Sequence, residues 1–192
     1  MDIVLLNGGG VDSLAAALIL KNSGHTLHSL HVQFDYPASA SMVVAAKAIA
    51  DAYCADQVVV TVAGLVPWGM NAPEATPTGR YRSVPNLQLV VSGIAASYAT
   101  RNGYSYIANG VKNQEVWGNG FEPAISALIA NHNHSQLKQP LLFMRPLSAL
   151  DDAAVYALVA GNSVLNQTVS CLSSPPCGTC FKCLLRKSHN LS

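Results

Sequence analysis

The stretch MDIVLLNGGGVDSLAAALILK, residues 1–21, decides the fold of this chain. It begins with a short apolar run over residues 1–6, which predicts a buried strand. Three glycines follow Asn7, and the residues from Leu14 to Lys21 predict a helix that ends at Asn22 to Gly24. Glycine lets the backbone turn tightly and approach a ligand without a Cβ in the way. The helix N-terminus then presents N–H groups to an anion, so this unit is a candidate phosphate site.

The glycine loop by itself leaves a second interpretation open. It matches neither the pattern GxxxxGK(S/T) nor GxGxxG, because the third glycine of the latter falls on Ser13. Asp12 and Ser13 are both residue types that cap helices. A plain tight turn, capped by Asp12, would explain the same residues.

Stretches with the character of strands and helices alternate along the rest of the chain. Strands are predicted over residues 27–34, 57–62, 104–109 and 141–144, and helices over residues 39–54, 86–101, 123–131 and 148–160. Pro123 is expected near the first turn of its helix. This alternation predicts an α/β fold with a doubly wound parallel sheet and helices on both faces. Such folds bind ligands at the carboxyl ends of their strands, where the glycine loop would lie.

Four cysteines near the end of the chain have the spacing C-x5-C-x2-C-x2-C: Cys171, Cys177, Cys180 and Cys183. Four thiolates can surround one Zn²⁺ at about 2.3 Å and close its coordination sphere, so the expected role is structural. An iron–sulfur cluster takes the same ligands. Disulfides or buried free thiols are the remaining alternatives.

Length and composition favour one compact domain over residues 1–192, with residues 162–192 as a zinc-binding tail. Half of the residues are hydrophobic, 11% are charged and the net charge is +1, which argues against stable nucleic-acid binding. So few charges also suggest that surface is buried in a homodimer. No apolar run approaches the roughly 20 residues that span a membrane, and no secretory signal is evident. A thiol-rich metal site without an export signal fits a cytoplasmic protein.

The segment Gly8-Gly9-Gly10-Val11-Asp12-Ser13 resembles the pyrophosphate loop SGGxDS of the N-type ATP pyrophosphatases, also called PP-loop enzymes. Together with the cysteines, it resembles the 7-cyano-7-deazaguanine synthase family, QueC. The matching tail residues are Ser170-Cys171, Cys177-Gly178-Thr179-Cys180 and Cys183-Leu184-Leu185-Arg186. This resemblance implies a fold similar to the adenine nucleotide alpha hydrolases.

Three positions depart from the family pattern. Gly8 stands where the loop has its first serine, and the segment Val84 to Leu89 lacks the family's arginine. Asp152 stands where a lysine is expected. Because cations near a triphosphate stabilise developing charge, Lys112, Arg80 or Arg82 would have to replace those that are missing.

The resemblance implies an ATP-dependent reaction. A small molecule, 7-carboxy-7-deazaguanine, is activated on its carboxylate by ATP, ammonia gives the amide, and a second activation gives the nitrile. Asp12 and Ser13 would be the catalytic residues, with Mg²⁺ accompanying ATP. The implied nucleotide-binding residues are Asn7, Gly8, Gly9, Gly10, Val11, Asp12, Ser13, Leu14 and Ala15. The implied substrate residues are Asp35, Gly110, Glu115, Trp117 and Glu122.

Two further functions stay open on the sequence. Because of Gly8 and Asp152, the chain could be a nucleotide-binding or regulatory module that has lost its chemistry. It could also be another PP-loop ligase or thiolase that acts on a different acceptor.

Overall fold

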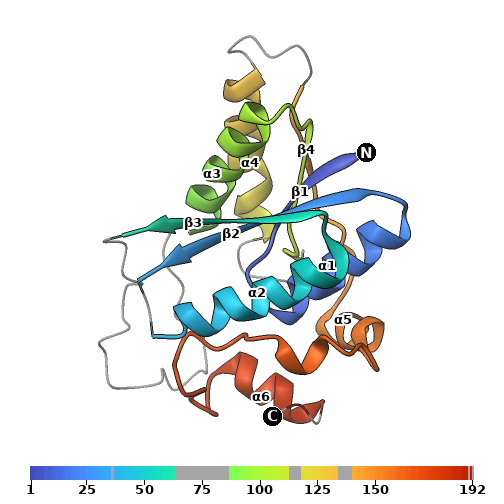
Figure 1. Cartoon of the computed structure of the whole chain (residues 1–192), viewed down its shortest axis with the longest axis vertical. Helices are drawn as coiled ribbons and strands as arrows, with labels where there is room; N and C mark the ends of the chain where they lie inside the picture. The colour runs from blue at the N-terminus through green and yellow to red at the C-terminus, as the bar shows by residue number, and fades with distance from the viewer. Residues whose placement is uncertain (36, 64–86, 113–117, 134–139, 190, 192) are drawn as a thin grey trace.

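The computed structural model describes residues 1–35, 37–63, 87–112, 118–133, 140–189 and 191 (Figure 1). The strands are β1 (Asp2–Leu6), β2 (Thr26–Phe34), β3 (Asp56–Val62), β4 (Tyr106–Ala108) and β5 (Leu142–Met144). The helices are α1 (Val11–Asn22), α2 (Ser39–Tyr53), α3 (Leu87–Arg101), α4 (Gly118–Asn133), α5 (Asp152–Val159) and α6 (Phe181–Ser188), with a short 3-10 helix η1 (Leu165–Gln167).

The strands form one parallel sheet in the order β3-β2-β1-β4-β5. β1 lies in its centre, where Ile3 pairs with Leu27 of β2 on one side and with Tyr106 of β4 on the other. Because helices cover both faces, Ile3, Val4 and Leu5 are fully buried, and the strand has to be apolar throughout. This arrangement confirms the α/β fold with a parallel sheet.

Helices cover the two faces of the sheet in two groups. One core cluster joins Ile3 and Leu5 to α1, to Ile49 of α2 and to Val155 of α5. A second cluster on the opposite face joins Val4 and Leu6 to α3 and α4. Figure 1 shows the same division, with α1, α2 and α5 below the sheet and α3 and α4 above it. The sheet is therefore doubly wound, as expected.

Several element bounds differ from the sequence prediction. α4 begins at Gly118, so Pro123 lies inside the helix and not near its first turn. α5 begins only at Asp152, because the side chain of Asp151 accepts the backbone N–H of Ala154 and caps the helix there. In the tail, η1 and α6 were not predicted.

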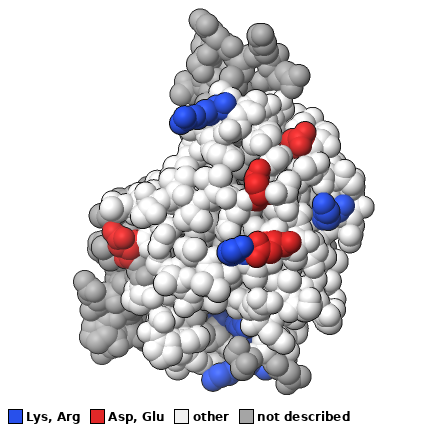
Figure 2. Space-filling view, viewed as in Figure 1, with Lys and Arg blue, Asp and Glu red and all other residues white. Residues whose placement is uncertain are grey.

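Charged side chains are sparse on the outside of the molecule. Most of the face in Figure 2 is free of them, and the lysine and arginine atoms that it shows are scattered from near the top to the bottom. The described helices include none that is both long enough and apolar enough to cross a membrane.

The order of the strands creates a crevice. The chain moves from β1 to β2 and β3 in one direction and then returns to β4 and β5 on the other side of β1. At such a reversal the segments that follow two neighbouring strands separate, and ligands bind between them. The glycine loop after β1 and the residues from Asn109 after β4 flank this point.

Candidate active site and metal centre

Asn7 holds the glycine loop in place. Its buried side-chain amide donates to Ser29 Oγ at 3.0 Å and to the Ala46 carbonyl oxygen at 2.8 Å. Its Oδ1 accepts the backbone N–H of Gly9 at 3.1 Å. One side chain therefore ties the loop to β2 and α2 at once.

The glycines meet different requirements. Gly9 has a φ of +78°, and a Cβ there would lie 2.6 Å from the carbonyl oxygen of Met42, so a larger residue is excluded. Gly8 donates its N–H to Ser13 Oγ at 3.0 Å, and a Cβ there would be 3.7 Å from that oxygen, an ordinary contact. A residue with a Cβ would therefore fit at position 8 without a clash.

The N-terminus of α1 faces the crevice with unused donors. Gly10 is the N-cap and no side chain caps the helix, so the expectation that Asp12 or Ser13 caps it is wrong; both lie in the first turn. Within the described part of the chain, the N–H groups of Val11, Asp12 and Ser13 have no acceptor. Such groups favour an anion.

Asp12 belongs to a cluster of charged side chains together with Lys112, Asp152 and Lys182. Lys112 Nζ lies 2.8 Å from Asp12 Oδ1 and 2.9 Å from Asp152 Oδ1. Lys182 Nζ lies 2.9 Å from Asp12 Oδ2. Asp12 comes from α1, Lys112 from the segment after β4, Asp152 from α5 and Lys182 from α6. These ion pairs therefore connect the start of α1 to the segment after β4, to α5 and to the tail.

Asp12 and Lys112 favour each other's charged form. Burial works against a charged Asp12, but Lys182 and then Lys112 hold the pKa of its carboxyl below the usual value. Burial likewise works against a charged Lys112, whose side chain is 3% exposed, yet Asp12 raises its pKa. Each charge in this cluster stabilises its neighbour, and removing one leaves another poorly compensated.

Gly110 lies directly against the loop. A Cβ at this position would be 2.7 Å from the Asp12 carbonyl oxygen and 3.0 Å from the Asp12 Cβ. The backbones on the two sides of the crevice therefore approach each other as closely as glycine allows, which brings Lys112, two residues later, to Asp12.

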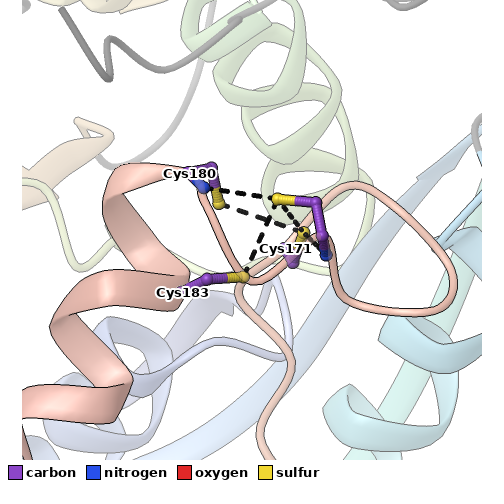
Figure 3. Close-up of side chains that lie close together, drawn as sticks. Cys171, Cys180 and Cys183 are labelled. Atoms are coloured by element: carbon purple, nitrogen blue, oxygen red, sulfur yellow. Dashed lines mark hydrogen bonds between the residues drawn. The ribbon is translucent and has the colours of Figure 1, made fainter. Parts of the chain in front are cut away.

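The four cysteines form a compact cage. Sγ of Cys171 lies 3.6 Å from Sγ of Cys177 and 4.0 Å from Sγ of Cys180, and the Cys177 and Cys183 sulfurs are 4.0 Å apart. Figure 3 shows these sulfurs pointing toward one another, with Cys180 and Cys183 at the start of α6. Four sulfurs at about 2.3 Å from one tetrahedral ion would be about 3.8 Å apart, so the cage fits a single ion.

The surroundings act differently on the cage thiols: burial raises the pKa of Cys180 to about 12 and also raises that of Cys183, whereas the pKa of Cys177 is lowered. Backbone N–H groups of Ser173 and Cys177 point at Cys171 Sγ, each at 3.4 Å. Burial opposes ionisation of Cys177, but the N–H groups of Thr179 and Cys180 lower the pKa of its thiol to about 6. A thiolate is the form that binds metal.

The cage adjoins the glycine loop. Val169 donates its N–H to the carbonyl oxygen of Gly9 at 2.9 Å, and a Cβ on Gly10 would lie 3.5 Å from Ser170 Oγ. Further along, the Leu172 carbonyl oxygen accepts the N–H of Ala38 at 3.2 Å. The segment that leads into the cage therefore covers the loop and the start of α2.

The other predicted site residues are distributed as follows. Leu14 and Ala15 are fully buried, and their side chains belong to the core. Asp35 is exposed and follows β2, at the carboxyl edge of the sheet. Glu115 and Trp117 lie outside the described residues, as do Arg80 and Arg82, and Glu122 is described only as part of the α4 backbone.

The sequence did not predict that Lys182 and Asp152 would join the site. On the sequence, Lys182 belongs with Arg186 and Lys187 to a basic group around the tail, for which a solvated face and a contact with phosphate or a partner both stay open, and Asp152 stands where a cation is missing. One signal was available for Lys182: it lies between two cysteines that must face one ion, so its position depends on the cage.

Comparison with known proteins places the chain in a class. Two solved structures share its fold, each with a TM-score of 0.58. The first is the crystal structure of a predicted subunit of tRNA methyltransferase from Methanocaldococcus jannaschii, at 22% identity over 83% of this chain and 76% of that one. The second is the U34-tRNA thiolase NcsA from Methanococcus maripaludis with its 4Fe-4S cluster, at 15% identity over 99% of this chain and 65% of that one.

The fold and the glycine loop at its crevice are those of the PP-loop enzymes, an ATP-utilising class. Within that class, the model of the family "Queuosine biosynthesis protein QueC" matches residues 2–190, so the chain belongs to the QueC family. A comparison with curated proteins gave no match.

Proposed function

We propose that this chain is an ATP-dependent synthetase that converts 7-carboxy-7-deazaguanine and ammonia to 7-cyano-7-deazaguanine. One observation carries the proposal: at the crevice of a PP-loop fold, the Asp12 carboxylate is held between the ammonium groups of Lys112 and Lys182. A carboxylate that can bind a divalent cation and a cation that can stabilise phosphate charge are both useful for this chemistry. Membership of the QueC family supports the substrate.

The loop residues would bind the triphosphate. The N–H groups of Val11, Asp12 and Ser13 are oriented for phosphate oxygens. The Ser13 hydroxyl accepts the N–H of Gly8 and keeps its own proton to donate. Mg²⁺, when bound, would neutralise phosphate charge, and Asp12 is its carboxylate ligand in this proposal. Lys112 replaces one of the cations that the family pattern places elsewhere.

The substrate would enter the crevice beside the loop. We assign Asp35, Gly110, Glu115, Trp117 and Glu122 to its binding, with Trp117 stacking on the flat ring. If the crevice holds the substrate carboxylate next to the ATP phosphate that it attacks, the two reactants no longer have to meet by diffusion, and the barrier to the reaction falls. Ammonia then displaces the activated oxygen to form the amide, and a second activation removes the amide oxygen to form the nitrile.

We propose that the cage holds one structural Zn²⁺. In a 4Fe-4S cluster each thiolate binds a different iron, so the four sulfurs lie further apart than around a single ion. Here all four sulfur atoms lie within 4.8 Å of one another. Elemental analysis of the purified protein should show one zinc per chain; stoichiometric iron and sulfide would contradict this.

The decisive experiment is mass spectrometry of the product formed from 7-carboxy-7-deazaguanine, ATP and ammonium. The nitrile is expected, and Asp12→Ala should abolish it. Calorimetry with ATP identifies the cause of a negative result. Without ATP binding at millimolar concentration, the enzyme proposal fails.

Binding of ATP without turnover would favour a nucleotide-binding module that has lost its chemistry. ATP hydrolysis that depends on a different acceptor would favour another PP-loop ligase or thiolase.

A further inference from the structure

Lys182 lies between two cysteines of the cage in the sequence, but its side chain contacts Asp12, which follows the glycine loop. It lies in the first turn of α6, between Cys180, which is the N-cap, and the buried Cys183. Its ammonium group lies 2.9 Å from Asp12 Oδ2, across 170 residues of sequence. The side chain is only 17% exposed, so solvent screens this contact weakly.

The cage fixes the position of the Lys182 backbone. The Cys180 sulfur lies 4.0 Å from that of Cys171, and the Cys183 sulfur lies 4.0 Å from that of Cys177. An ion shared by these four thiolates fixes the start of α6 relative to the segment that covers the loop. Since Lys182 lies between two ligands, an occupied cage holds its backbone in the position from which the side chain reaches Asp12.

Asp12 forms ion pairs with both Lys112 and Lys182. Lys112 and Lys182 carry two positive charges, and Asp12 and Asp152 two negative ones. If Asp12 binds a divalent cation, its ion pair with Lys182 weakens, and the Lys182 ammonium remains close to the first turn of α1, whose N–H groups are unused. A phosphate oxygen is the partner that an ammonium group binds in that position.

We propose that Lys182 binds a phosphate of the nucleotide, and that an occupied cysteine cage raises nucleotide affinity by holding Lys182 at the loop. This inference rests on the proposed nucleotide site and adds a residue and a coupling to it. Because coupling between two binding sites is reciprocal, nucleotide must in turn raise the affinity of the cage for its metal.

The first test compares Mg²⁺-ATP with adenosine by calorimetry, using the metal-loaded full chain. Lys182→Ala should bind Mg²⁺-ATP about ten- to a hundredfold more weakly than the wild type, and adenosine equally well. Lys182→Arg, which keeps the charge, should recover most of the affinity. Lys187→Ala is the matched control, because Lys187 lies on the same helix but its ammonium contacts the Gly178 carbonyl oxygen at 3.2 Å; its affinity should not change.

The second test follows transfer of the metal to a colorimetric chelator. Saturating Mg²⁺-ATP should lower the fraction of metal that the chelator takes at equilibrium from the wild type and from Lys187→Ala, and adenosine should not. In Lys182→Ala the nucleotide should have no such effect, although the metal is bound at the start. Metal content and a thermal melt of each variant establish that the comparison is made on folded protein.

Two results would overturn the inference while leaving the nucleotide site intact. One is that Lys182→Ala binds Mg²⁺-ATP as the wild type does; the other is that ATP and adenosine lose affinity equally, which would make Lys182 a structural tether. If the wild type itself binds no ATP, the proposed function fails, and the inference fails with it.

Discussion

Asp152 stabilises Lys112 in a nearly buried position, because its carboxylate lies 2.9 Å from the Lys112 ammonium. The sequence had suggested that Asp152 marks the loss of a catalytic cation. In the structure Asp152 instead pairs with a cation, Lys112, which comes from the segment after β4 and is buried between Asp152 and Asp12. Asp152 is therefore part of the same charge cluster as Asp12.

Replacing Asp152 with lysine should consequently harm the protein. Asp152→Lys would place a third ammonium beside Lys112, and we expect the free energy of unfolding to fall by about 2–4 kcal/mol. Asp152→Asn, which removes the charge but keeps a hydrogen-bonding side chain, should cost less. Urea denaturation measures both, and a rise in stability or turnover with Asp152→Lys would contradict this account.

Gly8 and Gly9 are adjacent, yet their substitutions should differ sharply. Gly9→Ala forces a Cβ to 2.6 Å from the Met42 carbonyl oxygen at a φ of +78°, so we expect a loss of about 2 kcal/mol or more and of ATP binding. Gly8→Ala meets only an ordinary contact and should change the unfolding free energy by less than about 0.5 kcal/mol. Denaturation and calorimetry test the pair, and equal effects would contradict the loop geometry.

The ionisation of Asp12 predicts a dependence of stability on pH. Its folded pKa lies below the ordinary aspartate value of about 3.9, so its contribution is complete above that pH and is lost as the pH falls through the folded pKa. Asp12→Asn should be less stable than the wild type by about 2–4 kcal/mol at pH 7, and the gap should narrow below pH 4. Acid also releases metal, but from both proteins. A difference in stability between the two proteins that grows in acid would contradict the ion pairs of Asp12.

At the scale of elements, α6 shows what a helix gains from a metal cage. It has only eight residues, too few to be stable alone in water. It is anchored by the sulfurs of Cys180 and Cys183, and Arg186 donates to Thr168 Oγ1 at 2.8 Å. The ion is therefore expected to supply much of the free energy that holds this helix.

Cys180→Ser separates metal binding from helix capping. Cys180 is the N-cap of α6, and serine is among the best N-cap residues, so the helix start itself is not weakened. We expect the variant to lose metal and to show faster amide hydrogen exchange in α6, with unchanged exchange in β1. Retention of one ion per chain would contradict the four-ligand cage.

The sequence predicted the sheet well because buried parallel strands require apolar runs, and the runs before Asn7 and around Leu30 are unmistakable. It also predicted the loop and the cysteines, since their spacing is local. It did not predict α6, whose stability we expect to depend on a bound ion, or the later start of α5. The ion pairs of Lys182 and Asp152 join distant segments, and local patterns do not encode such contacts.

At the scale of the whole molecule, apolar side chains remain on the surface. Val59 on the edge strand β3 is 40% exposed and Leu142 on the opposite edge, β5, is 46% exposed; on α6, Leu184 is 52% exposed. With so few charges, such a surface favours self-association.

We expect a homodimer, and sedimentation of the metal-loaded chain at micromolar concentration would show it. Val59→Lys and Leu142→Lys test the two edges separately, and the edge that forms the interface should yield monomer. A monomeric wild type with its metal bound would contradict the expectation.

The contact between Asp12 and Lys182 also orders events during synthesis. Asp12 leaves the ribosome early, but its partner follows 170 residues later. At about 5–20 residues per second, the loop carboxylate waits on the order of ten to thirty seconds for that cation. Until the cysteines have emerged and captured their ion, the nascent chain holds an incomplete phosphate site. We therefore expect full nucleotide affinity only after α6 has been synthesised, and a chain truncated before α6 should fold its sheet without gaining it.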